Sequence, residues 1–152
     1  MKMNKDFNIV VPIINKGNNE TPTRPATNGS AGIDLRYNGE DRILKPLERG
    51  LFPTGLHMAL PEGHVGLVCP RSGLALKQGL SICNAPGIID CDYRNDVGVI
   101  LINLSNENIE IHNGDRIAQL VIVEYKKPEF ITVETLDNTE RGMGGFGHSG
   151  VK

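Results

Sequence analysis

The chain has 152 residues and a formal net charge of -2, which suits one domain with its own core and does not favour a nucleic-acid-binding surface. No apolar run reaches the length of a membrane-spanning helix, and the polar first residues do not resemble a signal peptide, so no membrane partner is expected. Cys69, Cys83 and Cys91 lack metal-binding spacing, and we expect reduced, mostly buried thiols in a cytoplasmic protein.

The first part of the chain predicts short strands. Residues 7–14 are apolar, and Pro12 indicates a strand at the edge of a sheet, because proline has no N–H to donate. Residues 15–30 are polar and typical of a surface loop, whereas residues 31–37 alternate in the manner of a strand. Further short strands are expected at residues 42–47, 50–60 and 64–69.

Only residues 72–77 predict a helix. Ser72 is a good N-cap, residues 74–76 are helix formers, and Gly79 suits the end of the helix. Strands are expected again at residues 97–104, 109–112, 117–125 and 130–136. Because there is neither an internal repeat nor a linker, we expect one antiparallel all-β domain over residues 1–136, a jelly roll or barrel, with a flexible arm over residues 137–152.

A hairpin is expected at residues 84–96. Pro86–Gly87 predicts a turn in which Gly87 is free to take a positive φ, and Asn95–Asp96 predicts a second turn. Between the turns, Ile88 and Ile89 begin a short strand. Asp90 and Asp92 would share a face if the chain stays extended.

Three side chains of this hairpin have a chemical use. The Asn84 amide offers a donor and an acceptor side by side, which matches the imide edge of a uracil-like base. The Tyr93 ring can lie against a sugar and leave no space for an extra hydroxyl. Asp90, beside two isoleucines, would be partly desolvated and therefore a better proton acceptor near neutral pH. The alternative is a plain hairpin in which Asn84 and Asp92 are turn residues and Tyr93 belongs to the core.

The glycine-rich stretch 141–150 predicts neither a strand nor a helix. One interpretation is a disordered tail. The other is a loop whose backbone amides wrap phosphate oxygens, with Arg141 supplying charge and Phe146 a face that stacks on a base. His148 and Ser149 would then supply hydrogen-bond donors.

Five segments, at residues 31–35, 70–79, 84–96, 113–121 and 141–150, together resemble the five ordered motifs of the homotrimeric deoxyuridine triphosphatases (dUTPases). The match covers nearly the whole chain. Its most specific pieces are residues 70–75 (Pro-Arg-Ser-Gly-Leu-Ala) and 87–93 (Gly-Ile-Ile-Asp-Cys-Asp-Tyr). Because the five motifs occur in order and with suitable spacing, the resemblance outweighs the structural interpretation of each motif taken singly.

The resemblance implies cleavage of dUTP to dUMP and pyrophosphate by water attack at the α-phosphorus, which keeps uracil out of DNA and supplies dUMP for thymidylate synthesis. It implies that Asp90 orients and deprotonates the water and that Tyr93 excludes a 2′-hydroxyl. The residues implied to contact uracil and the nucleotide are Asn84, Gly87, Ile88, Ile89 and Gly98.

The resemblance also implies a phosphate side. Arg71, Ser72 and Gly73 at the start of the helix would hold phosphates, as a helix N-terminus can do. Gln119 would bind phosphate as well. Mg²⁺ would be held mainly by the triphosphate, with Asp34 contacting it through water, and Asp115 would brace the site.

In the family the site lies between subunits of a homotrimer, and a third subunit supplies the tail. Arg141 and Phe146 would then cover the phosphates and the uracil, with Gly147, His148 and Ser149 around the γ-phosphate. Two departures are visible: Asn95 stands where glycine is common, which its tolerance of positive φ would explain, and His148–Ser149 replaces a frequent pair of hydroxyl residues.

Three alternatives stay open. A deoxycytidine triphosphate deaminase shares the fold but needs a glutamate at the pyrimidine 4-position, and residues 84–96 contain none. A non-enzymatic regulator would keep the pocket and signal through occupancy. A glycosidase would use Asp90 and Asp92 as a carboxylate pair.

Overall fold

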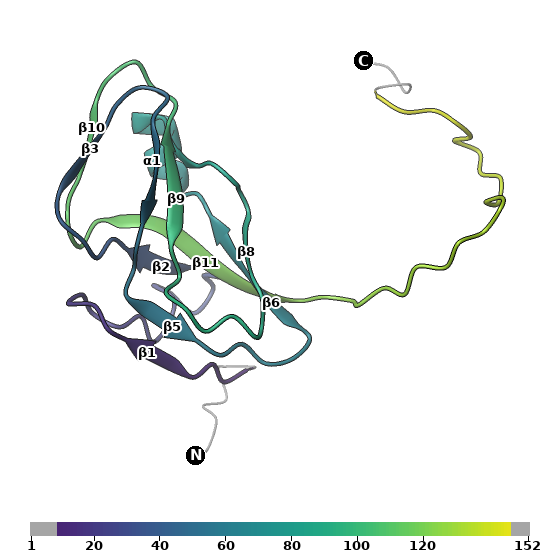
Figure 1. Ribbon diagram of the computed structural model, residues 1–152, viewed down its shortest axis with the longest axis horizontal. Helices are drawn as coiled ribbons and strands as arrows, with labels where there is room; N and C mark the ends of the chain where they lie inside the picture. Colours follow the sequence, from purple (N-terminus) through teal and green to yellow (C-terminus); the bar gives the residue numbers. More distant parts are fainter. Residues whose placement is uncertain (1–8, 147–152) are drawn as a thin grey trace.

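Antiparallel strands make up most of the structure, a computed structural model that describes residues 9–146 (Figure 1). The elements in this part of the chain are β1 Ile13–Asn15, β2 Ile33–Arg36, β3 Arg42–Leu44, β4 Arg49–Phe52, β5 Leu56–Met58, β6 His64–Cys69, α1 Ser72–Gln78, β7 Leu80–Ile82, β8 Gly87–Ile89, β9 Val99–Asn103, β10 Ile109–Ile111 and β11 Arg116–Glu124.

The strands pair in four antiparallel groups, β1-β5, β10-β3, β2-β11-β6-β8 and β4-β9-β7. The long strand β11 is the centre of the largest group, since it pairs with β2 on one side and with β6 on the other. β1 pairs with β5 alone, in agreement with the edge position that Pro12 indicated. The prediction of an antiparallel all-β, jelly-roll-like body with one short helix is confirmed.

The core lies between the sheets and follows the alternation of the strands. In β9, Val99, Leu101 and Asn103 are fully buried, while the residues between them are half-buried. Phe52 of β4 is also fully buried; its ring meets that of Tyr37 edge-on at 5.0 Å between centroids. Burial of one such ring stabilises the fold by about 1.5–3 kcal/mol.

The helix has the predicted extent but not the predicted cap. α1 begins at Ser72, and the N-cap is Arg71, which has extended backbone and no capping side-chain bond. The expectation that Ser72 caps the helix is therefore wrong. Gly79 ends the helix as predicted, with φ of 68°, and its N–H donates to the carbonyl oxygens of Ala75 and Leu74.

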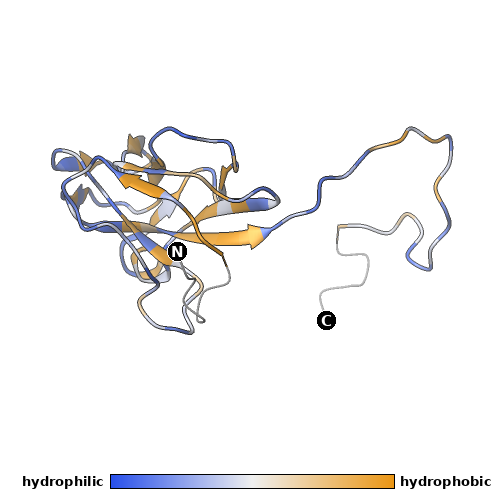
Figure 2. Cartoon of the chain, turned by 90° about the horizontal axis from the view of Figure 1, so that it is seen from below, coloured by the Kyte–Doolittle hydropathy of each residue, from blue (hydrophilic) through white to orange (hydrophobic). Residues whose placement is uncertain are grey.

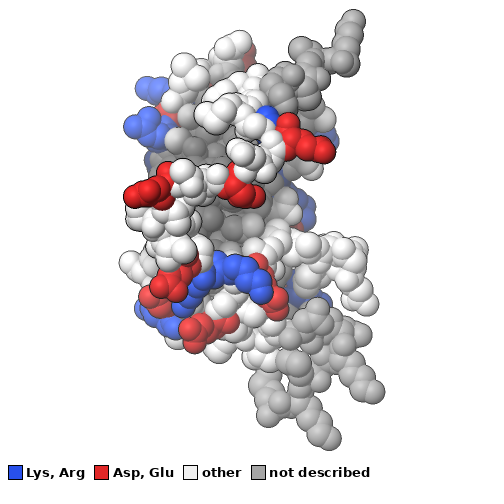
Figure 3. Space-filling view, turned by 90° about the vertical axis from the view of Figure 1, so that its right-hand side faces the viewer, with Lys and Arg blue, Asp and Glu red and all other residues white. Residues whose placement is uncertain are grey.

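The cysteines differ from expectation. All three are free, but Cys83 is exposed and Cys69 and Cys91 are half-buried, so the prediction of mostly buried thiols is wrong. On the face that Figure 3 shows, acidic and basic side chains are interspersed and no single sign dominates. No helix within residues 9–146 is long and apolar enough to cross a membrane.

The chain leaves the body after β11 and runs outward as a long arm (Figures 1 and 2). The strand expected at residues 130–136 is not formed in the single chain. Its apolar side chains are exposed instead, Phe130 by 91%, Ile131 by 76% and Leu136 by 83%. The domain boundary after residue 136 stays a prediction.

Candidate active site

A pocket of about 380 Å³ opens at β8, between this strand and the β4–β9 pair. Residues from three separate stretches line it, and seven of them are the residues that the sequence assigns to the base, the sugar and the attacking water. These seven are Asn84, Gly87, Ile88, Ile89, Asp90, Tyr93 and Gly98. The structure therefore gathers the predicted nucleotide side in one cavity, while the role of each residue stays a prediction.

Glycine at two pocket positions is explained by close approach. A Cβ on Gly87 would lie 3.2 Å from the Cβ of Val68, the residue that Gly87 pairs with on β6. A Cβ on Gly98 would lie 2.6 Å from the Leu51 side chain. Gly87 opens β8 with ordinary strand backbone, so the expected positive φ at a Pro86–Gly87 turn is wrong; the turn comes earlier, at Cys83–Asn84.

The hairpin expected over residues 84–96 is not formed, because β8 pairs with β6 whereas β9 pairs with β4 and β7. The chain instead turns directly after β8 and continues as a loop to β9. The Tyr93 N–H donates to the Asp90 carbonyl oxygen over 3.1 Å, so Asp90 and Asp92 do not share one face of a strand as expected. Asp90 is exposed, and the expected partial desolvation is not found in the single chain. Asn95 has no positive φ either; its side-chain oxygen accepts from the Asp96 N–H over 2.8 Å instead.

The Tyr93 ring stands at the pocket wall and not in the core. It is 40% exposed, and its hydroxyl donates to the Asp96 carbonyl oxygen over 3.0 Å. Asn84 is likewise exposed at the pocket. Both side chains thus have access to a ligand, which the plain-hairpin alternative does not require.

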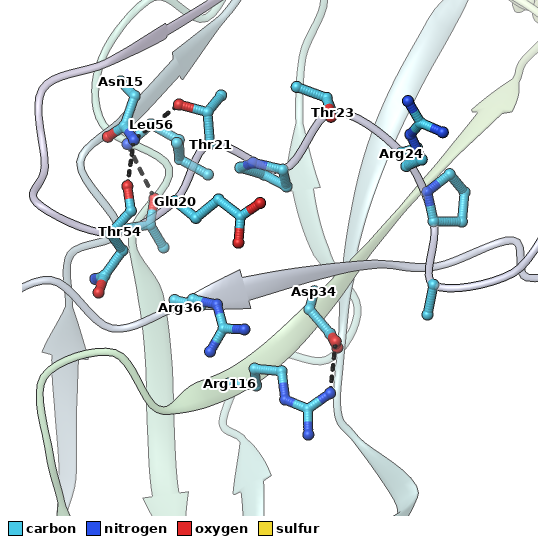
Figure 4. Close-up of a pocket in the computed structure, with 14 residues that line it drawn as sticks. Asn15, Glu20, Thr21, Thr23, Arg24, Asp34, Arg36, Thr54, Leu56 and Arg116 are labelled. Atoms are coloured by element: carbon cyan, nitrogen blue, oxygen red, sulfur yellow. Dashed lines mark hydrogen bonds and ion pairs between the residues drawn. The ribbon is translucent and has the colours of Figure 1, made fainter.

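A second group of predicted residues forms an ion-pair cluster outside this pocket. The Asp34 carboxylate on β2 binds Arg71 Nε at 3.1 Å and Arg116 Nη1 at 3.2 Å. The Arg71 guanidinium also donates from Nη1 to the Arg116 carbonyl oxygen over 3.2 Å. Figure 4 shows Asp34 and Arg116 facing each other at the wall of a pocket of about 550 Å³.

Gln119 connects this cluster to the start of the helix. It lies opposite Asp34 and Cys69 in the ladders of β11, and its Nε2 donates to the Pro70 carbonyl oxygen over 2.9 Å. A Cβ on Gly32 would come within 2.3 Å of Gln119 Oε1, so a larger residue there would displace the end of the Gln119 side chain. Ser72 and Gly73 follow at the exposed start of α1.

The two groups do not form one site within a single chain. Of the described residues that the sequence assigns to phosphate or metal, none lines the β8 pocket. The strand β6 separates them in the sheet, because it pairs with β8 on one side and with β11 on the other. One chain therefore presents two separate candidate part-sites, the β8 pocket and the charged cluster at Asp34.

The cluster fits a magnesium ion that is carried by phosphates. No group of three or more His, Cys, Asp or Glu that could hold a metal occurs within residues 9–146. Asp34 is the carboxylate of the cluster; its two oxygens offer about four acceptor positions, and the two arginines use part of them. Because Mg²⁺ keeps several waters and uses few protein carboxylates in triphosphate sites, this donor set suits it.

Asp115 lies in the turn before β11, next to Arg116 of the cluster, and its bracing role stays a prediction. Its carboxylate accepts from the His112 N–H over 2.8 Å. On the other side, His112 Nδ1 lies 2.8 Å from Asp41 Oδ2, and this hydrogen bond raises the pKa of His112 above its ordinary 6.5. The same bond lowers the pKa of Asp41 below its ordinary 3.8.

Sequence reasoning missed two residues of the sites. Arg116 completes the Asp34 cluster, and its place directly after Gly114–Asp115 in the fourth segment was the available signal. Asp96 connects the pocket wall to the turn at Thr54–Gly55 through its carboxylate, and no sequence pattern indicates this contact.

Within residues 137–146, the arm makes no hydrogen bond or ion pair with either part-site of its own chain. Arg141 Nε donates to the Gly144 carbonyl oxygen over 2.7 Å, within the arm, and Phe146 is fully exposed. Gly147, His148 and Ser149 lie outside the described residues. Within residues 137–146 the arm forms turns but no strand or helix, as its glycine content predicts.

Comparison with known proteins gives consistent results. The dUTPase family model matches residues 18–150. The deoxyuridine 5'-triphosphate nucleotidohydrolase of Finegoldia magna is 50% identical over 141 residues, which cover 92% of this chain and 98% of that protein. A variant of the Staphylococcus bacteriophage 80alpha dUTPase, solved with dUpNHpp, has a TM-score of 0.82 at 31% identity and covers 93% of this chain and 99% of its own.

A second solved structure concerns a metal. It is a variant of the dUTPase from phage phi11 of S. aureus, described with the coordination of a structural Mg(II) ion. The TM-score is 0.76 at 26% identity, and the match covers 86% of this chain and 100% of that one.

Proposed function

The chain belongs to the dUTPase family, and from that membership we propose that it hydrolyses dUTP to dUMP and pyrophosphate, with water attacking the α-phosphorus. The observation that carries this proposal is the β8 pocket, which collects all seven residues expected to meet the base, the sugar and the water. The reaction keeps uracil out of DNA and supplies dUMP. The free cysteines suit a reducing cytoplasm, where we place the enzyme.

The base and the sugar bind in the β8 pocket. The exposed Asn84 amide pairs with the uracil edge, together with the backbone of residues 87–90. A strand backbone that closes on uracil leaves little room for a 5-methyl group. Tyr93 packs against the deoxyribose, where a 2′-hydroxyl would collide with its ring.

Asp90 acts as the general base. Its side chain makes no hydrogen bond or ion pair with any residue that the structure describes, so its oxygens are free to hold a water molecule. Asp90 takes a proton from this water while the oxygen attacks the α-phosphorus, and the bond to the bridging oxygen breaks to release pyrophosphate. Docking of nucleotide and a neighbouring subunit would exclude bulk water around this carboxylate.

The phosphates bind at the Asp34 cluster of the adjacent subunit. Arg71, with Ser72 and Gly73, and Gln119 contact the phosphate oxygens, and Asp34 holds Arg71 in place through its 3.1 Å ion pair. When bound with the triphosphate, Mg²⁺ neutralises phosphate charge, and Asp34 is the residue that would hold it through its water shell.

This arrangement supports a homotrimer with shared sites. Each chain presents two separate part-sites, so a complete site requires a second copy. The exposed apolar side chains of residues 130–136 also need a partner surface, which a neighbouring subunit would provide. The arm of a third subunit then brings Arg141 and Phe146 over the phosphates and the uracil, with Gly147, His148 and Ser149 near the γ-phosphate.

Release of pyrophosphate from dUTP, UTP, dCTP and dTTP, measured in parallel, tests the function. We expect a preference for dUTP of about a hundredfold or more over each of the others, since a single misfit group in a rigid site has such an effect. Turnover of dCTP with release of ammonia would indicate a deaminase. Nucleotide binding without any pyrophosphate release would indicate a regulator.

A further inference from the structure

Asp96 lies in the wall of the β8 pocket, and its carboxylate accepts hydrogen bonds from a distant turn of the chain. Its Oδ1 accepts from the Thr54 N–H over 3.0 Å, and its Oδ2 accepts from the Gly55 N–H over 2.9 Å. The Thr54 hydroxyl lies 3.4 Å from Oδ1 as well. Both carboxylate oxygens are therefore occupied by the turn between β4 and β5.

This turn is buried and closely packed. Thr54 is only 2% exposed, and its hydroxyl donates to the Val97 carbonyl oxygen over 2.8 Å. Gly55 has φ of 75°, and a Cβ there would lie 2.6 Å from the backbone nitrogen of Gly17. The turn is therefore closely packed against its neighbours in the fold.

The backbone of Asp96 links this turn to the residues that face the inside of the β8 pocket. Its carbonyl oxygen accepts from the Tyr93 hydroxyl over 3.0 Å and from the Gly98 N–H over 2.9 Å. Asp96 therefore joins Tyr93 and the backbone at Gly98, just before β9, to the buried turn.

We propose that Asp96 is a positioning residue that sets the discrimination between deoxyribonucleotides and ribonucleotides, because it holds the Tyr93 ring at a fixed place against the sugar. The proposal rests on the proposed function, in which Tyr93 excludes the 2′-hydroxyl. A ring that could swing away would admit a ribose, whereas a fixed ring collides with it. Asp96 has no part in the chemical step, so its removal should affect the choice of sugar more than the turnover of dUTP.

The residue type follows from the two N–H donors that it must satisfy. A carboxylate accepts with both oxygens, whereas an Asn amide accepts with one and turns an N–H₂ group toward the other donor. Asp96→Asn keeps the size of the side chain and loses one of the two anchoring bonds. Tyr93→Phe keeps the Asp96 carboxylate and removes the hydrogen bond from the Tyr93 hydroxyl to the Asp96 carbonyl oxygen.

The test measures kcat/KM for dUTP and for UTP in the wild type, Asp96→Asn, Tyr93→Phe and the double variant. Asp92→Asn serves as the control, since this exposed carboxylate of the same loop makes no hydrogen bond or ion pair with the residues that the structure describes. We expect the dUTP-to-UTP ratio to fall about tenfold in each single variant, as for one lost hydrogen bond to a charged or fixed group. The double variant should lose little more, because both changes break one connection.

An unchanged ratio in Asp96→Asn would overturn the inference while the proposed function stands. If Asp96→Asn does not fold, Tyr93→Phe decides alone, and an unchanged ratio there overturns the inference in the same way. A wild-type protein that does not hydrolyse dUTP would instead overturn the proposed function, and this inference with it.

Discussion

Replacement of Asp90 by Asn should abolish turnover and leave the fold and nucleotide binding intact. The Asp90 side chain is exposed and has no hydrogen-bond or ion-pair partner among the described residues, so its amide replacement breaks no folding contact. A surface change of this kind alters the free energy of unfolding by about 0.5 kcal/mol or less.

The effect on the reaction should be much larger. Loss of a general base lowers the rate by about 10²–10⁴-fold. At about 1.36 kcal/mol for each factor of ten, this raises the activation barrier by about 2.7–5.5 kcal/mol. The barrier change therefore exceeds the stability change at least fivefold by these estimates, which separates a chemical role from a structural one.

The assay is pyrophosphate release together with calorimetric titration of dUTP. Affinity for dUTP should stay the same or rise slightly, because the amide removes a negative charge near the triphosphate. Asp92→Asn is the matched control. Asp92 is an exposed carboxylate two residues away, to which we assign a structural role in the loop after β8. Near-normal turnover in Asp90→Asn, or loss of turnover in Asp92→Asn, would show that the wrong carboxylate has been assigned.

Three further outcomes are expected. Light scattering should give the mass of a trimer, and a stable, active monomer would contradict the shared site. A chain that ends after Asn138 should keep its fold and its trimer but lose most activity, since residues 139–146 hydrogen-bond only within the arm; full turnover or unfolding would refute the role of the arm. The raised pKa of His112, caused mainly by its hydrogen bond to Asp41, implies a stabilising contribution that is complete below pH 6.5 and lost as pH rises through the folded pKa. NMR titration should show this pKa above 6.5 and its return toward 6.5 in Asp41→Asn, and an imidazole that titrates at or below 6.5 would contradict the pairing.

Sequence signals predicted correctly those boundaries of helices and strands that depend on neighbouring residues in the chain. Gly79 ends α1 through a left-handed backbone conformation that glycine favours, and Pro12 keeps the first strand at a sheet edge. The strand β6 has the predicted bounds, His64–Cys69, because a Pro–Glu–Gly turn precedes it and Pro70 follows it. The gathering of the seven predicted residues in the β8 pocket was also predictable, since six of the seven lie within residues 84–96, although their roles stay predictions.

Features that depend on distant contacts were not predictable from residue patterns. The Arg71–Asp34–Arg116 cluster joins three segments far apart in the chain, so the place of Arg116 after Gly114–Asp115 does not by itself show that it pairs with Asp34. The strand expected at residues 130–136 has a suitable pattern, but a strand forms only where a partner offers its edge, and the single chain offers none there. The sequence assigned Gly87 to a turn. In the structure, glycine suits this position because the Val68 side chain on the neighbouring strand lies close to it.

A site shared between subunits is tested most directly by mixing two inactive variants. Asp90→Asn lacks the proposed base in the β8 pocket, and Arg71→Ala lacks the phosphate contact of the Asp34 cluster. After the two chains are unfolded and refolded together in equal amounts, a site is complete only where an intact Asp90 of one chain faces an intact Arg71 of the next. Random assembly of symmetric contacts then restores about a quarter of the wild-type sites. We predict pyrophosphate release from dUTP at about this level in the mixture and almost none from either variant alone, whereas a mixture as inactive as its components would contradict the shared site.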